Sequence, residues 1–181
     1  MIFDSVFWKK ELNKNYKGIL KYNNVEMLNK KFDATYNNIE KNIFLSAFII
    51  RKLVESKKLT DKIDKYERIV SGYSIMNQIN RLNRFDIDEN YDFKHIKPCN
   101  IKFKDLCNWL IHSYVCSLKF DDYGKATGFY VASDYDKNKI IYEIPLEYWM
   151  EYIKTVIEDN INKVTYIYDE NKQDYIVTEK K

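Results

Sequence analysis

Turn-forming residues are scarce in this chain, since its 181 residues include only four glycines and two prolines. So few of them exclude collagen-like, linker-rich and many-turned sandwich proteins, and they favour long helices. A chain of this length can bury roughly 70% of its unfolded surface. We therefore expect one compact domain, or a domain with a small appendage.

Cysteine is also rare, and the count of three is odd. Cys99, Cys107 and Cys116 are interpreted as reduced thiols in the cytoplasm, because no secretory signal precedes them. The longest strongly apolar tract, residues 43–50, is interrupted by Ser46. We expect no signal peptide, no membrane span and a cytoplasmic location.

Arginine is scarce too, with 4 residues against 26 lysines. Lysine, asparagine, isoleucine and tyrosine all have A/T-rich codons and are abundant, which indicates a low-GC bacterium or its phages and mobile elements. Residues 1–66 carry 14 basic and 8 acidic side chains, whereas residues 120–181 carry 8 basic and 13 acidic ones. One interpretation is that these halves attract each other within the fold or between copies. The other is a basic face for RNA or DNA.

Apolar spacing predicts a front half made of helices. The stripe over residues 25–58 predicts one helix, or a broken pair, at the centre of a bundle. A shorter helix is expected at 60–69, then a short helix and a long surface connection over 75–97. The periodicity of residues 103–118 predicts another helix, and residues 4–21 predict the first one.

The back half changes character, because β-branched and aromatic residues there alternate with turn-forming residues. The predicted elements are a first hairpin, a helix and a second hairpin, with strands at 128–132 and 139–144, the helix at 146–161, and strands at 164–168 and 175–178.

The expected fold class is therefore α+β, mainly α. A helical bundle over about residues 4–119 carries a C-terminal extension of β-hairpin, helix and β-hairpin. The expected division is a bundle at 1–119 and a strand-bearing extension at 120–181, packed together as one compact unit.

Metal and cofactor motifs are incomplete. Cys107 and Cys116 are nine residues apart, which on one helix sets them about 180° apart, so they cannot share a zinc ion. His112 and Cys116 could share one, but two ligands do not make a structural zinc site. Asp134, Asp136 and Asn138 copy only half of a calcium loop, which indicates a hairpin turn. We expect no metal and no cofactor.

The most informative segment is residues 107–113, in which Asn108 and His112 are one helical turn apart and share a face. This pair resembles the motif of HEPN-type helical-bundle proteins, whose ribonucleases use an arginine, a polar residue that is often asparagine, three further residues and a histidine. Asn108 and His112 match, and Cys107 stands where the arginine is expected. The resemblance implies a role for both residues in RNA contact or catalysis. The alternative is a structural histidine whose ring bonds a neighbouring carbonyl.

Arg51 is the third candidate site residue, because its planar fork suits a carboxylate or a phosphate. Glu55 follows one turn later, so one interpretation is an Arg51–Glu55 ion pair. The other is that Arg51 supplies the cation that is missing at position 107.

Three functions are compatible with these observations. The first is a non-catalytic interaction protein of a bacterial or phage module, of the defence or toxin–antitoxin type, that binds a protein partner or forms a homodimer. The second is a metal-independent ribonuclease with His112 at its site. The third is a nucleic-acid-binding module that uses the basic N-terminal half.

Overall fold

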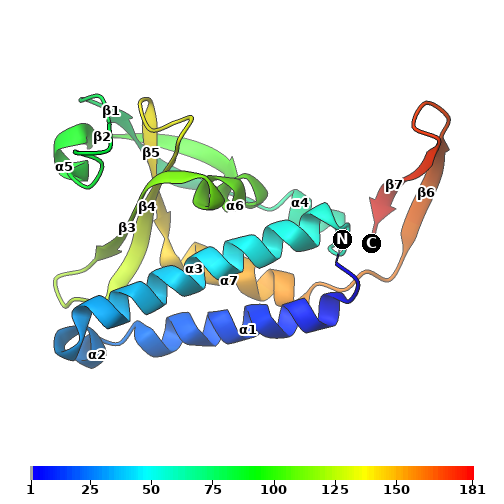
Figure 1. Cartoon of the computed structure of the whole chain (residues 1–181), viewed down its shortest axis with the longest axis horizontal. Helices are drawn as coiled ribbons and strands as arrows, with labels where there is room; N and C mark the ends of the chain where they lie inside the picture. The colour runs from blue at the N-terminus through cyan, green and yellow to red at the C-terminus, as the bar shows by residue number, and fades with distance from the viewer. Residues whose placement is uncertain (1) are drawn as a thin grey trace.

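The computed structural model describes residues 2–181 as one α+β body with a projecting hairpin (Figure 1). Its helices are α1 (Ser5–Tyr22), α2 (Val25–Lys30), α3 (Phe32–Glu55), α4 (Asp61–Asp64), α5 (Ile87–Asn90), α6 (Phe103–Ile111) and α7 (Leu146–Glu158). Its strands are β1 (Glu67–Ile75), β2 (Tyr91–Lys102), β3 (Ser113–Phe120), β4 (Ala126–Ser133), β5 (Ile140–Pro145), β6 (Val164–Asp169) and β7 (Asp174–Lys180).

A five-stranded antiparallel sheet in the order β2-β1-β5-β4-β3 is the centre of the fold. Helices α6 and α7 pack against it, and α3 and α1 lie beyond them (Figure 1). The larger core fills the space between these helices and the sheet, with Trp149, Tyr152 and Phe103 at its centre. A smaller cluster that includes Tyr73, Tyr91 and Ile141 forms a second core.

The expected helical bundle over residues 4–119 is wrong, because β1, β2 and β3 all lie in that range. Strands from both sides of residue 119 share one sheet. The predicted helix at 60–69 has only the single turn of α4 before β1 begins, and the predicted connection at 75–97 contains the start of β2. Gly72 lies inside β1 and faces Ile140 and Cys99.

The predicted helix at 103–118 is also wrong in its second half, where β3 begins at Ser113. His112 ends α6, with its backbone N–H donating to the carbonyls of Asn108 and Leu110. Segment 114–118 has apolar side chains at spacings that fit both a helix and a strand, and its pairing with β4 decides for the strand.

Other predictions are confirmed. The first helix is α1, the helix at 146–161 is α7, and both predicted hairpins form, as β4–β5 and β6–β7. Residues 25–58 form the broken pair, α2 and α3, which separate at Lys31. Helix α3 packs between α1 and α6. Over the described residues, no helix combines the length and the apolar content that crossing a bilayer requires.

Candidate functional site

Arg51 and His112 meet at the surface between α3 and α6. Arg51 lies in the penultimate turn of α3, and its Nη1 is 3.2 Å from Nε2 of His112. The two residues are 61 positions apart in sequence, so the packing of α3 on α6 brings them together. This is the proximity that the second interpretation of Arg51 requires.

The chemistry of the two groups fixes the direction of this hydrogen bond. A guanidinium has only donors, so Nη1 donates and Nε2 of His112 accepts. The imidazole accepts this hydrogen bond in the tautomer that has its proton on Nδ1. The lone pair of Nε2 then points at the guanidinium of Arg51. A potential base and a positive charge are therefore neighbours at this site.

Arg51 also makes the ion pair that the first interpretation expects. Its Nε donates to Oε1 of Glu55 at 2.7 Å, and Lys52 Nζ lies 2.9 Å from Oε2 of the same carboxylate. Hydrogen bonds from Lys52 and Arg51 hold the pKa of Glu55 below its ordinary value. Of the five donors on the guanidinium, Glu55 and His112 engage one each, so the ion pair with Glu55 leaves other donors of Arg51 for further contacts.

The backbone of His112 is held from two directions. Its N–H donates to the carbonyl of Asn108 at 3.0 Å, and its own carbonyl accepts from the N–H of Asp134 at 3.1 Å. The first bond closes the last turn of α6, and the second ties that turn to the loop between β4 and β5. The side chains of Asn108 and His112 are both exposed. The site therefore consists of exposed side chains on a backbone that hydrogen bonds hold in place.

Cys107 is buried beneath this surface. Burial raises the pKa of its thiol, and the nearby Arg51 charge opposes that rise to a smaller extent. Arg51, Cys107 and Asn108 line one hollow of about 310 Å³, together with Lys104 and Asp105. The guanidinium of Arg51 thus lies beside position 107, where the resemblance expects an arginine.

A second hollow of about 430 Å³ lies on the other side of Asn108 and includes His112. Its remaining walls are Trp109 and the turn between β4 and β5. The ring of Trp109 stacks on Tyr142 with a centroid distance of 4.5 Å and an interplanar angle of 5°. Tyr135, in that turn, is 80% exposed.

Local sequence patterns indicated no role in a functional site for Trp109, Tyr135 or Asp134. The segment from Asp134 to Asn138 is the predicted hairpin turn, but a local pattern does not tell which helix a turn will meet. The pairing of β3 with β4 brings Ser133 opposite Ser113, and so brings the turn next to His112. The spacing of residues along the sequence does not predict such a long-range contact.

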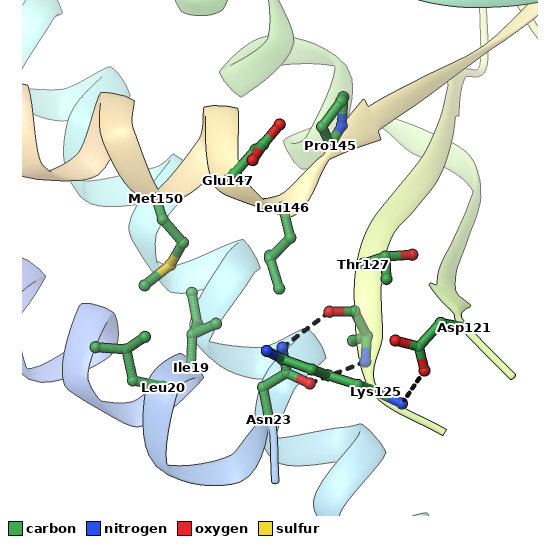
Figure 2. Close-up of a pocket in the computed structure, with 11 residues that line it drawn as sticks. Ile19, Leu20, Asn23, Asp121, Lys125, Thr127, Pro145, Leu146, Glu147 and Met150 are labelled. Atoms are coloured by element: carbon green, nitrogen blue, oxygen red, sulfur yellow. Dashed lines mark hydrogen bonds between the residues drawn. The ribbon is translucent and has the colours of Figure 1, made fainter. Parts of the chain in front are cut away.

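Another hollow, of about 690 Å³, lies between the end of α1, the start of β4 and the first turn of α7 (Figure 2). Its polar residues hold its walls together. The Asn23 side chain exchanges two hydrogen bonds with the backbone of Ala126, and Asp121 accepts from the N–H of Lys125. Ile19, Leu146 and Met150 give it an apolar floor (Figure 2).

The three cysteines lie on different elements: Cys99 on β2, Cys107 on α6 and Cys116 on β3. Cys107 and Cys116 do not lie on opposite sides of one helix, as expected, because Cys116 is in a strand. Burial raises the pKa of the Cys116 thiol to about 12. Within residues 2–181, no three His, Cys, Asp or Glu side chains converge as metal ligands.

Comparisons with protein-family models, with curated proteins and with solved structures give no match for this chain.

Proposed function

We propose that this protein binds RNA at Arg51, Asn108 and His112 and cleaves it by attack of the ribose 2′-hydroxyl, without a metal ion. The observation that carries the proposal is the 3.2 Å contact between Arg51 Nη1 and His112 Nε2. This contact joins a permanent cation and an acceptor nitrogen within the span of one phosphate. An imidazole and a guanidinium supply the base and the charge stabilisation that this reaction needs.

In the proposed reaction the scissile phosphate takes the donor that Arg51 now directs at His112. Nε2 is then free to accept the proton of the 2′-hydroxyl. The 2′-oxygen forms a bond to phosphorus while the bond from phosphorus to the 5′-oxygen breaks. The 5′-oxygen takes a proton from water, and the hydroxide left behind takes the proton from Nε2 and returns the imidazole to its starting state. The products are a 2′,3′-cyclic phosphate and a 5′-hydroxyl. Arg51 stabilises the additional negative charge of the phosphorane.

The surroundings support an RNA substrate. Unstacked bases bind to aromatic side chains, and the hollow that contains His112 also contains Trp109 and the exposed ring of Tyr135. Asn108 stands between the two hollows and offers both a donor and an acceptor. Glu55 keeps the guanidinium of Arg51 in place when no substrate is bound.

Cleavage of a fluorescent single-stranded RNA in the presence of EDTA tests the proposal. We expect His112→Ala and Arg51→Ala each to reduce the cleavage rate by at least about 100-fold, the usual range for an acid–base group or a charge-stabilising donor. The chain contains its own control, because His95, the only other histidine, is 80% exposed and pairs with Asp92. His95→Ala should keep the wild-type rate.

The thermal stability of His112→Ala should stay within about 1–2 kcal/mol of the wild type, because the side chain lies outside the core. Equal activity of His112→Ala and wild type would contradict the proposal. A large loss of stability with unchanged cleavage would identify His112 as a packing residue.

A second candidate function is RNA binding without cleavage, and a specific feature of α1 favours it. Lys10, Lys14, Lys17 and Lys21 are all exposed and follow the spacing of one helical face. Phosphate contacts by such a stripe release counterions, so binding should weaken steeply with salt. Replacing all four lysines with glutamine should flatten the salt dependence. An unchanged slope would remove the stripe from the RNA interface.

A further inference from the structure

The C-terminal hairpin has no covering layer of its own. Strands β6 and β7 form a separate two-stranded sheet that projects from one end of the molecule (Figure 1). Four of its large apolar side chains are each at least half exposed: Tyr166, Ile167, Tyr168 and Tyr175. An isolated two-stranded hairpin is marginally stable in water. Exposed apolar residues on such an element are typical of an interaction surface.

The root of the hairpin is fixed to the body. Lys180 is 4% exposed, and its Nζ lies 3.0 Å from Asp64 and 3.3 Å from Asp61. Before the hairpin, the carboxylate of Asp159 accepts from the N–H of Thr60 at 2.8 Å. Both ends of the hairpin are therefore anchored near α4. These anchors hold the hairpin in its projecting direction.

An apolar groove opens at the same end of the molecule. It lies between the start of α1 and the last turns of α3, has a volume of about 550 Å³, and is lined by Ile2, Trp8 and Phe48. Phe7, next to Trp8, is 58% exposed. In Figure 1 the start of α1, the end of α3 and the root of the hairpin all lie at one end of the molecule.

The charges of the groove and of the hairpin tip are complementary. Lys52, Lys57 and Glu55 lie in the wall of the groove, and Lys52 pairs with Glu55, so the wall carries a net charge of +1. The turn of the hairpin, residues 169–174, carries three acidic side chains and Lys172, which pairs with Asp169, so its net charge is −2. Opposite charges at the rim of an interface guide encounter and fix its register. The groove and the hairpin thus match in both apolar and charged character.

We propose that the hairpin of one copy docks into the α1/α3 groove of a second copy, and that the exchange is reciprocal. Because the hairpin and the groove lie at one end of the molecule, a two-fold axis at that end lets each copy give its hairpin and receive its partner's. Strands of six and seven residues span about 20 Å at roughly 3.3 Å per residue, which is enough to reach across such an axis. The occupant of the groove is therefore a second copy of this chain.

Light scattering coupled to gel filtration tests the assembly on the full chain. At about 50 µM we expect a mass of twice 21.9 kDa for the wild type. Ile167→Lys on the hairpin and Phe7→Glu beside the groove should each weaken dimerisation by at least about tenfold and shift the mass toward one chain. Tyr123→Glu, at an 81% exposed residue between β3 and β4, is the matched control and should stay dimeric.

Disulfide trapping shows which surfaces meet. Ile167→Cys mixed with Lys57→Cys should give a covalent dimer of the two variants, and neither variant alone should give that product. A disulfide inside a single chain that carries both substitutions would place the hairpin on its own groove and overturn the proposal. A monomeric wild type, or a dimer that survives Ile167→Lys and Phe7→Glu, would also overturn it.

Discussion

Gly128 offers a stringent test of the sheet that replaces the expected bundle. It lies in β4 opposite Pro145 of β5, at one end of the pairing between these two strands, and it faces Lys119 of β3 on its other side. A Cβ at this position would lie 2.6 Å from the carbonyl oxygen of Ile144, which is a backbone atom. Real Cβ atoms do not come that close to a backbone oxygen, so the Gly128→Ala chain must move β4 away from β5.

The magnitude follows from two opposing effects. Overpacking a well-packed site costs about 1–3 kcal/mol, and the upper end applies here because a backbone obstacle cannot rotate away. Replacing glycine with alanine recovers about 0.4–1 kcal/mol from the unfolded chain. We therefore expect Gly128→Ala to lower the free energy of unfolding by about 2 kcal/mol, or roughly 4–8 °C in melting temperature for a domain of this size.

Gly72→Ala is the matched control, because the nearest atoms there are the side-chain ends Ile140 Cδ1 at 2.6 Å and Cys99 Sγ at 2.8 Å. These atoms can move, so its loss of stability should be clearly smaller than that of Gly128→Ala. Urea unfolding followed by circular dichroism measures both variants. Equal stability of Gly128→Ala and wild type would refute the close approach of β4 to β5.

The remaining predictions concern buried groups. Burial, and then the hydrogen bond to Glu143, raise the pKa of Tyr73 to about 12 from its ordinary value of 10. This tyrosine therefore contributes stability that is present below pH 10 and lost as the pH rises toward 12, and Tyr73→Phe should reduce the slope of unfolding free energy against pH in that window. Burial also raises the thiol pKa values of Cys107 and Cys116, so iodoacetamide at pH 8 should label Cys99 first in the folded protein. Mass spectrometry of the labelled peptides checks this order, and early labelling of Cys107 would contradict its burial.

Local sequence patterns predicted the elements that depend on local physics. Helices α1, α3 and α7 have continuous apolar stripes, and the hairpin of β4 and β5 has β-branched strands on either side of a turn-forming segment. By contrast, β1 and β2 pair across a 15-residue connection that contains α5, and β3 joins the sheet only through β4. Such strands gain their stability from partners distant in sequence, which is why their segments were assigned to helices or loops.

The candidate site also has parts that local sequence patterns predict and parts that depend on long-range packing. The closeness of Asn108 and His112 follows from one helical turn, and the Arg51–Glu55 pair from another. The contact of Arg51 with His112 depends on how α3 packs against α6, and sequence reasoning offered it only as one of two alternatives. Trp109 and Tyr135 are recognised as part of the site only from the structure, in which the turn after β4 lies beside the end of α6. Long-range packing, which local periodicity does not encode, decided these parts.

The central claim is that Arg51 and His112 activate a ribose 2′-hydroxyl, and the most direct measurement uses two versions of one RNA oligonucleotide. One version is all RNA, and the other has a 2′-deoxy nucleotide at the cleavage position mapped on the first. In EDTA we predict that the wild-type protein cleaves the first to fragments ending in a 2′,3′-cyclic phosphate and leaves the second intact at that position. Cleavage of the deoxy-substituted version at the same rate, or no cleavage of either version by the wild type, would contradict the account.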